Sequence, residues 1–215
     1  MLFEDRRDAG RALASLVAAL PDLNHGLVLA LPRGGVPVGF EVAHALGLPL
    51  DILIVRKLGA PGVPELAMGA VASGGVVVSN PEVLRSLRIP DAVFDATAKH
   101  AMSELAGREQ LYRGALPPLE IEGRTAILVD DGLATGATMR SAARAVRQRS
   151  GRVIIAVPVA AASSLYELEL ETDRILCAAV PESFEAVGQY YRNFEATSDE
   201  EVCALLKEAR AWLHS

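Results

Sequence analysis

Short, largely apolar runs of residues, separated by segments with a helical pattern, set the fold of this chain. The runs are residues 27–31, 50–55, 126–129, 153–159 and 175–180. The helical segments are residues 5–20, 36–46, 137–149, 163–171 and 199–213. Apolar runs of this length are typical of strands that a sheet buries on both faces. Strands that alternate with helices predict an α/β fold, with a doubly wound, mostly parallel sheet and helices on both of its faces.

The stretch between the second and third runs departs from this alternation. The expected elements are, in order, a Gly- and Pro-rich loop at 58–65, short strands or a hairpin at 68–72 and 76–79, and a polar helix at 91–115. The sequence contains neither an internal repeat nor a linker. We therefore expect one domain over residues 1–215, with a helical insertion at about 81–120.

Composition excludes several classes of function. The chain has 215 residues, of which 51% are apolar, and a net charge of −6. Broad binding to nucleic acid or to anionic membranes needs a basic surface, which this charge argues against. The charged start predicts no signal peptide. The longest apolar run, residues 153–162, is broken by Pro158 and is shorter than the roughly 20 residues of a membrane helix. We expect a cytoplasmic protein with no membrane or nucleic-acid partner.

Residues 126–138 carry the most informative motif, Ala-Ile-Leu-Val-Asp-Asp-Gly-Leu-Ala-Thr-Gly-Ala-Thr. An apolar strand ends in two carboxylates, Asp130 and Asp131, and a loop of small residues leads straight into a helix. Such a loop lets backbone N–H groups converge, and the helix adds its positive N-terminal end, so both favour a phosphate. The hydroxyls of Thr135 and Thr138 can donate as well. Adjacent carboxylates can accept hydrogen bonds from two sugar hydroxyls or hold a hydrated Mg²⁺. The segment predicts a sugar-phosphate site.

The Thr135-Gly136 loop alone fits an ordinary strand-to-helix turn equally well. The two acids before it weigh against that plainer interpretation, because adjacent buried carboxylates repel each other and lose their hydration. The whole segment therefore favours a ligand site.

This segment resembles the signature of the type I phosphoribosyltransferases, an apolar strand followed by two acids and a Thr/Gly-rich loop. The segments Leu31-Pro32-Arg33-Gly34-Gly35 and Val55-Arg56-Lys57-Leu58-Gly59 resemble a subgroup of the same family. The resemblance implies that the acids bind the ribose hydroxyls of phosphoribosyl pyrophosphate (PRPP), and that the loop after them holds its 5′-phosphate. It implies a pyrophosphate loop after the first strand, with a non-proline cis peptide bond. The implied substrate-binding residues are Arg33, Gly34, Gly35, Asp130, Asp131, Gly132, Leu133, Ala134, Thr135, Gly136, Ala137 and Thr138.

Arg33-Gly34-Gly35 taken alone fits a plain turn better than an anion site. Sheet topology strengthens the second interpretation. In a doubly wound sheet with the strand order 3-2-1-4-5, strands 1 and 4 are neighbours, and ligands bind beyond their carboxyl ends. The loops after Leu31 and Val129 would then face one crevice, with the ribose between the pyrophosphate and the 5′-phosphate.

Arg56 and Lys57 follow the second strand, at the same edge of the predicted sheet. Two cations there can neutralise a leaving pyrophosphate, although two solvated surface charges are the plainer interpretation. Residues 58–67 resemble the mobile loop of the family, which closes over the substrate and excludes water. Glu65 is the only acid in that loop, and it is our candidate for the group that takes the acceptor's proton. The expected catalytic residues are therefore Arg56, Lys57 and Glu65.

Aromatic residues gather towards the C-terminal end of the chain, at Phe184, Tyr190, Tyr191 and Phe194. In the family a variable hood beyond the core binds the acceptor, so we expect a small C-terminal hood at about 181–197. A hydrophobic anchor for a C-terminal extension explains the cluster equally well. Many family members that act on 6-oxopurines carry an Asp at the position of Ala134, and its absence argues against that acceptor.

The sequence therefore predicts a transferase that moves the 5-phosphoribosyl group from PRPP to a nitrogenous acceptor such as a nucleobase, with release of pyrophosphate. Mg²⁺ is the expected cofactor, held by Asp130 and Asp131 through water or substrate. An apolar surface and the habit of the family favour a homodimer. Two alternatives stay open. One is a non-catalytic PRPP sensor or regulatory protein, and the other is an unrelated nucleotide or sugar-phosphate enzyme, although the chain lacks the P-loop and dinucleotide-binding glycine motifs.

Overall fold

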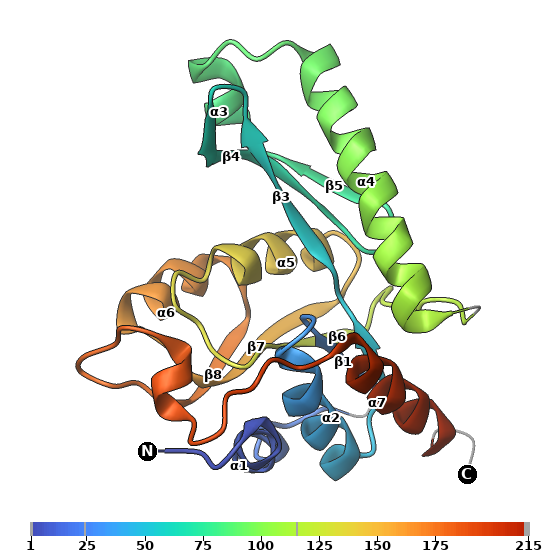
Figure 1. Ribbon diagram of the computed structural model, residues 1–215, viewed down its shortest axis with the longest axis vertical. Helices are drawn as coiled ribbons and strands as arrows, with labels where there is room; N and C mark the ends of the chain where they lie inside the picture. Colours follow the sequence, from blue (N-terminus) through green and yellow to red (C-terminus); the bar gives the residue numbers. More distant parts are fainter. Residues whose placement is uncertain (1, 24, 115, 213–215) are drawn as a thin grey trace.

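A parallel five-stranded sheet forms the centre of the protein (Figure 1). The structure is a computed structural model, and it describes residues 2–23, 25–114 and 116–212. The strand order is β2-β1-β6-β7-β8, and every neighbouring pair is parallel. The strands are β1 (Gly26–Ala30), β2 (Leu50–Ile52), β6 (Thr125–Val129), β7 (Arg152–Val159) and β8 (Arg174–Ala179). The predicted parallel α/β sheet is confirmed.

Helices cover both faces of this sheet, as the alternation of elements predicts. Helices α5 (Ala137–Arg147) and α6 (Ala162–Leu168) lie on one face, and α1 (Arg6–Ala18), α2 (Gly35–Leu46) and α7 (Asp199–Trp212) lie on the other (Figure 1). The sheet is therefore doubly wound.

The twofold period of the strands places the two largest apolar clusters of the core on opposite faces of the sheet. In β1, Leu27 and Leu29 belong to the cluster that contains α5, whereas Val28 and Ala30 belong to the cluster that contains α1, α2 and α7. All four residues are at most 2% exposed, because successive side chains of a strand point to opposite faces of a sheet. Burying one such Leu or Val side chain contributes roughly 1.5–3 kcal/mol. These apolar runs thus explain why the central strands are covered on both sides.

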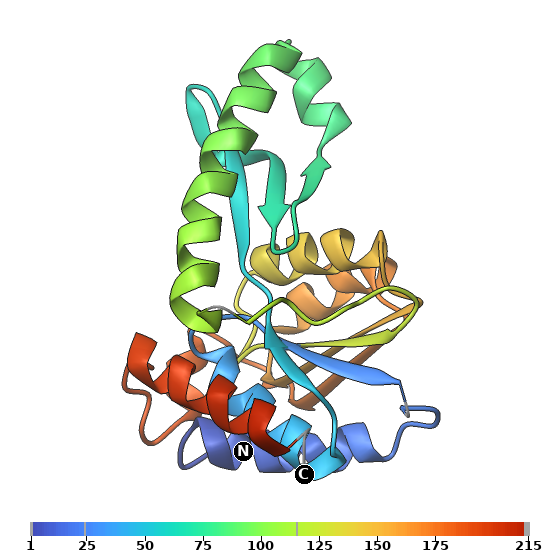
Figure 2. The ribbon, with the colours of Figure 1, turned by 90° about the vertical axis from the view of Figure 1, so that its right-hand side faces the viewer.

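Residues 55–79 leave the central sheet and form a second, antiparallel sheet of β3 (Val55–Ala60), β4 (Val63–Ala72) and β5 (Val76–Ser79), in that order. Together with α3 (Pro81–Ser86) and α4 (Asp91–Arg113), this sheet rises from the core (Figures 1 and 2). We call residues 55–113 the insertion module.

The predicted loop at 58–65 is wrong, because its residues pair as a hairpin. Ala60 lies opposite Val63 in the ladder of β3 and β4, so Pro61 and Gly62 make a two-residue turn. The φ angle of Gly62 is 77°, which suits glycine at the third position of a turn that has Pro at the second. The Pro-Gly pair is thus a compact turn between strands.

The predicted strand at 50–55 is also divided. β2 ends at Ile52, and Val55 already begins β3 of the antiparallel sheet. Arg56 and Lys57 therefore belong to the insertion module and do not end a central strand. Within the described ranges no strand lies outside β2, so the order 3-2-1-4-5 is wrong at that edge. The adjacency of β1 and β6, on which the predicted crevice depends, is confirmed.

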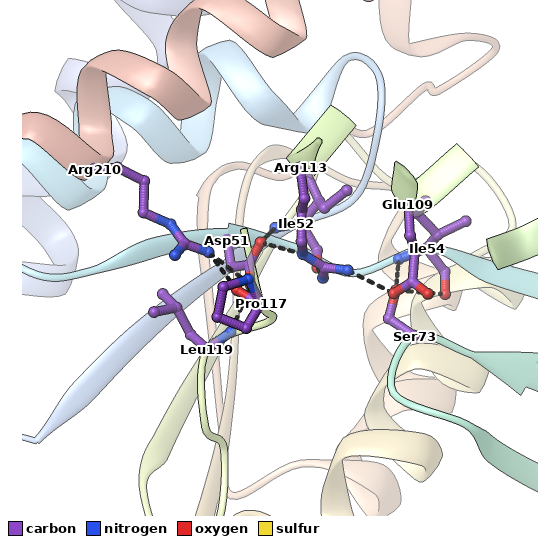
Figure 3. Close-up of polar contacts among 9 residues, drawn as sticks. All are labelled: Asp51, Ile52, Ile54, Ser73, Glu109, Arg113, Pro117, Leu119 and Arg210. Atoms are coloured by element: carbon purple, nitrogen blue, oxygen red, sulfur yellow. Dashed lines mark hydrogen bonds and ion pairs between the residues drawn. The ribbon is translucent and has the colours of Figure 1, made fainter. Parts of the chain in front are cut away.

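A buried ionic network fastens the insertion module to the central sheet (Figure 3). Asp51 of β2 is only 2% exposed, and its Oδ1 accepts a hydrogen bond from Arg113 Nε, at the end of α4, at 2.8 Å. Arg113 also donates to Glu109 Oε1 at 2.6 Å and to the carbonyl oxygen of Ile52 at 2.8 Å. Arg210 of α7 lies 3.6 Å from Asp51 Oδ2. Although burial alone would lower the pKa of Arg113, the Asp51 carboxylate raises it.

Several boundaries differ slightly from the sequence expectations. The polar helix predicted at 91–115 is α4, whose last residue is Arg113. Residue 115 lies outside the described residues, and so does residue 213, the predicted end of the last helix. Residues 169–171 form a short 3-10 helix after α6. Every helix in the described ranges is too short or too polar to cross a membrane.

Candidate active site

The loops that follow β1 and β6 meet at one edge of the sheet. Ala30 and Val129 are paired at the ends of the two strands, and the Leu31 N–H donates to the carbonyl oxygen of Val129 at 2.8 Å. The contact is so close that a Cβ built at Gly34 would overlap Asp131 Oδ2. The structure thus brings together the two loops that the sequence predicts to form one crevice.

Two helix N-termini open on this edge without a side-chain cap. Gly34 precedes the first residue of α2, and Gly136, with a φ angle of 67°, precedes the first residue of α5. The first N–H groups of a helix have no partner within the helix, and they carry a partial positive charge. A pair of such ends beside neighbouring strands suits a ligand with two separate phosphate groups.

The acid pair lies between these two ends, below the surface but still accessible to solvent. Asp130 Oδ1 accepts the N–H of Asp131 at 2.9 Å. Burial and, secondly, the neighbouring Asp131 charge raise the pKa of Asp130 well above its usual value. Burial also raises the pKa of Asp131, against the opposing effect of Arg6, whose Nε donates to Asp131 Oδ2 at 2.8 Å. Two carboxylates and one cation therefore meet where the predicted ribose site lies.

In the rest of the predicted phosphate loop, some residues are exposed to solvent and others are held by hydrogen bonds. Thr135 and Thr138 are exposed. The carbonyl oxygen of Ala134 accepts a hydrogen bond from the Ser164 hydroxyl, and Leu133, which is buried, donates its N–H to the carbonyl oxygen of Val159 at 2.9 Å. The loop is therefore fixed to the end of β7 while its exposed residues remain free to contact a ligand.

The predicted pyrophosphate loop has the expected backbone conformation. The side chain of its arginine, however, lies against the start of α7 and not against the acid pair. The peptide bond between Pro32 and Arg33 is cis, as the resemblance implies. The Arg33 guanidinium lies 3.8 Å from Asp199 Oδ1, at the first residue of α7. Asp199 also accepts a hydrogen bond from the Tyr112 hydroxyl at 2.6 Å. With burial as the larger cause, this bond helps to raise the pKa of Tyr112 to about 12.

The aromatic segment at 181–197 packs against the acid pair. The Tyr191 hydroxyl donates to the carbonyl oxygen of Asp131 at 2.6 Å, and burial raises the pKa of Tyr191, so this proton stays in place. Val187 fills the space where Gly132 lacks a side chain. Phe3 pairs with Tyr191 through the backbone and through its ring. The segment is thus anchored to the site and to the N-terminal residues.

The three predicted catalytic residues of the insertion module do not lie together. Successive residues of a strand point to opposite faces, and Arg56 Nη2 pairs with Glu104 Oε2 of α4 at 2.9 Å, away from Lys57. Lys57 Nζ donates to the main-chain oxygen of Glu65 at 3.1 Å. The Glu65 side chain is exposed and makes no hydrogen bond or ion pair with any other described residue. Lys57 alone of the three points towards α5.

Lys57 borders a cleft of about 270 Å³ between the insertion module and α5. Ala137, the first residue of α5, borders the same cleft, as do Asn80, Arg140 and Arg144. No acid is among the described residues that line it. The structure thus brings Lys57 and the end of the predicted phosphate loop to one basic space, large enough for a small ligand.

Sequence reasoning missed Arg6 and the role of Tyr191 as contacts of the acid pair. Arg6 is 125 residues from Asp131 along the chain, and nothing in its helix distinguishes it from Arg7. For Tyr191 the only signal was the local cluster of aromatic residues.

Comparison with known proteins agrees with this geometry. Residues 6–195 match the phosphoribosyl transferase domain. The chain belongs to this family, and its sheets have the architecture of type I phosphoribosyltransferases.

Two relatives resemble the chain over nearly its whole length. "Putative phosphoribosyl transferase Rv0571c" of Mycobacterium tuberculosis is 46% identical over 209 residues, which are 97% of this chain and 47% of the relative. The solved structure of TT1426 from Thermus thermophilus is 44% identical with a TM-score of 0.89, over 97% of this chain and 99% of that one. The bifunctional protein PyrR of Roseiflexus sp. is 32% identical over 124 residues, 56% of this chain and 62% of the relative. The chain spans about half the length of the mycobacterial relative.

Proposed function

We propose that the protein binds PRPP and transfers its 5-phosphoribosyl group to a small nitrogenous acceptor, with release of pyrophosphate. One observation carries this proposal: two uncapped helix N-termini and a pair of carboxylates meet beyond the ends of β1 and β6. A phosphate and a pyrophosphate joined by a ribose have the charge and the hydroxyls that such a site accommodates.

Each part of the site has a proposed role. Residues 134–138 hold the 5′-phosphate, and residues 33–35 hold the pyrophosphate. Asp130 and Asp131 accept hydrogen bonds from the ribose hydroxyls. As the bond between ribose C1 and pyrophosphate breaks, positive charge develops on the ribose ring and negative charge on the leaving group. The chain therefore has to position the reactants and stabilise the leaving anion.

The carboxylate pair also fits the proposed cofactor. No group of three or more acids, histidines or cysteines that could hold a metal ion exists among the described residues, so these residues offer no complete set of metal ligands. Mg²⁺ retains several waters and is commonly held by one or two carboxylates together with substrate phosphates. Asp130 and Asp131 would hold it in that way, and it would supply positive charge to the pyrophosphate.

The insertion module supplies the proposed catalytic groups. Lys57 faces the cleft that Ala137 also borders, and the insertion module has to carry it towards residues 33–35 before its charge can stabilise the leaving pyrophosphate. Arg56 is the second proposed cation, and it has to leave Glu104 to reach the ligand. Glu65, near the tip of the hairpin and without a side-chain partner among the described residues, is the proposed acceptor of the proton that the nitrogen nucleophile loses.

We propose that residues 181–197 form the hood over the acceptor, within a single domain that includes the insertion module. Their packing against Asp131 supports this position. Ala134 favours an acceptor other than a 6-oxopurine. The absence of a membrane-spanning helix in the described ranges is compatible with the cytoplasmic location that we propose, and a homodimer remains part of the proposal.

Thermal unfolding tests the donor site directly. With Mg²⁺ and PRPP at 100 times its dissociation constant, we expect the folded state to gain about 2.7 kcal/mol, which raises Tm by about 5–11 °C for a chain of this size. The double variant Asp130→Asn/Asp131→Asn should fold and lose this shift. Ribose 5-phosphate and ATP serve as comparison ligands. A folded protein whose Tm is unchanged at millimolar PRPP would contradict the proposal.

Replacing Lys57 should weaken pyrophosphate binding. Loss of one charge-assisted hydrogen bond costs about 1.5–3 kcal/mol, so we expect Lys57→Gln to raise the dissociation constant of pyrophosphate by roughly 10–100-fold. The matched control is Lys99→Gln, which removes an exposed lysine of α4 in the same insertion module, and which should change the constant less than threefold. Calorimetric titration of both variants measures this. A dissociation constant within threefold of wild type for Lys57→Gln, or an equal rise for Lys99→Gln, would contradict the role of Lys57.

The arrangement of the insertion module also favours a second candidate, a PRPP sensor without catalysis. Arg56 is already paired, and the Glu65 side chain contacts no partner among the described residues. A thermal shift with PRPP, without pyrophosphate release for any nitrogenous acceptor screened, would favour this candidate.

A further inference from the structure

Arg6 is the side chain through which three separate segments of the site meet. It is the first residue of α1, fixed there by the helix cap of Asp5, whose side chain accepts the N–H of Asp8. Its Nε donates to Asp131 Oδ2 at 2.8 Å, and its Nη1 donates to the carbonyl oxygen of Glu195 at 2.6 Å. Its guanidinium carbon lies 4.0 Å from the centre of the Phe194 ring.

Arg6 also borders the predicted pyrophosphate loop. A Cβ built at Gly34 would lie 3.1 Å from Arg6 Nε. The Arg6 and Asp131 side chains are only 12% and 16% exposed, so their interaction is largely shielded from water. An ion pair of this kind depends far more on geometry than one on the open surface.

The next residue, Arg7, provides a natural comparison. Its Nη1 donates to Glu41 Oε1 at 3.0 Å, and its guanidinium lies 5.0 Å from the Phe40 ring. Both partners belong to α2, away from the acid pair, and the Arg7 side chain is 44% exposed. Two neighbouring arginines with similar chemistry therefore contact different parts of the protein.

The contact from Arg6 leaves half of the Asp131 carboxylate available. Oδ2 is occupied by Arg6, whereas Oδ1 accepts no hydrogen bond from any described residue. The Tyr191 hydroxyl holds the carbonyl oxygen of the same residue. The planar guanidinium donates in a fixed direction, so it determines where the second carboxylate oxygen points.

We propose that Arg6 is a positioning residue for ribose recognition. It orients Asp131 so that Oδ1 accepts one sugar hydroxyl, and it joins this carboxylate to the 181–197 segment through Glu195 and Phe194. This inference rests on the proposed function, because it assumes that Asp131 binds the ribose.

Sugar discrimination tests the role of Arg6. The ligands are ribose 5-phosphate and its 2-deoxy and 3-deoxy analogues, each titrated with Mg²⁺ into the full chain. The ratio of the dissociation constants of deoxy and parent sugar measures what each hydroxyl contributes. All three ligands share the 5′-phosphate, so a general loss of stability or of phosphate binding leaves the ratios unchanged. The variant Asp131→Asn shows which of the two ratios, that of the 2-deoxy or that of the 3-deoxy sugar, depends on the Asp131 carboxylate.

In Arg6→Met we expect the deoxy-to-parent ratio that depends on Asp131 to fall about tenfold. The ratio for the other deoxy sugar should stay within a factor of two. Arg6→Lys, which keeps the charge and loses the planar geometry, should recover part of the discrimination. Arg7→Met should keep both ratios. If Arg6→Met does not fold, Arg6→Gln provides the same comparison.

The outcomes separate the two proposals. Wild-type protein that binds and discriminates, together with a folded Arg6→Met variant that discriminates equally well, would overturn the role of Arg6 and leave the proposed function intact. Wild-type protein that binds the three sugars without discrimination would overturn the role of Arg6, because no hydroxyl would then be recognised through Asp131. A wild-type Tm that does not change at millimolar PRPP would overturn both proposals.

Discussion

Replacing Arg113 by methionine should destabilise the protein by about 3–5 kcal/mol, because it leaves the Asp51 carboxylate charged in the core. Asp51 is 2% exposed and the Arg113 side chain is 6% exposed, so water cannot take the place of the lost hydrogen bonds. Arg210, at 3.6 Å, is too distant to replace them fully. For a chain of this size the expected fall in Tm is about 6–20 °C.

Two further variants test this explanation. Arg113→Met/Asp51→Leu removes this ion pair, and it should recover part of the stability, because a buried ion pair can often be exchanged for apolar residues at little cost. The recovery is incomplete because Arg210 and the Leu119 N–H lose Asp51, and Glu109 loses Arg113. The control Arg192→Met breaks an ion pair with Glu4 in which both side chains are 63% exposed, and it should change stability by less than about 1 kcal/mol. Urea unfolding measures all three. A loss below about 1 kcal/mol for Arg113→Met would show that the network does not fasten the insertion module.

Gly34→Ala should reduce PRPP affinity by about 100-fold while leaving the protein folded. The added Cβ would overlap Asp131 Oδ2 and lie 2.6 Å from Asp131 Cγ. Gly34 has helical backbone angles, with φ at −59° and ψ at −32°, so alanine fits the backbone itself. The carboxylate is the end of a flexible side chain and can rotate away, which gives up its contact with Arg6. Loss of a hydrogen bond to a charged group costs about 1.5–3 kcal/mol, which is up to about 100-fold in affinity.

The control for this variant is Gly107→Ala, in the exposed face of α4, where an added Cβ meets nothing within 4 Å. It should keep PRPP affinity and gain about 0.5–1 kcal/mol of stability from the helix preference of alanine. Calorimetric titration with PRPP and thermal unfolding compare the two variants. Donor affinity within threefold of wild type in folded Gly34→Ala would mean that the contact between the two loops does not matter for binding.

Local chemistry made the central sheet predictable, and also the meeting of the loops that follow β1 and β6. The apolar runs at 27–31 and 126–129 are recognisable without any partner, because strands buried on both faces need apolar residues at every position. Asp130 and Asp131 were also recognisable, since two adjacent acids at the end of such a strand have no ordinary structural explanation.

The parts that the sequence did not predict depend on contacts between distant residues. The hairpin at 55–72 was misjudged because Pro61 and Gly62 fit a loop as well as a tight turn, and only strand pairing distinguishes the two. Asp51 lies in a run that is otherwise apolar, and its partner Arg113 is 62 residues away along the chain. Arg6 has the same local environment in sequence as Arg7, so only the fold separates their roles.

The uncapped starts of α2 and α5 give the site a positive potential that no side chain carries. Backbone amides do not titrate across the range in which proteins fold, so their attraction for phosphate stays constant while the acids beside them change charge. It also persists in every variant that keeps the backbone in place. Side chains around these two loops can therefore diverge and change which molecule is recognised, while the proposed attraction of the two helix ends for phosphate remains.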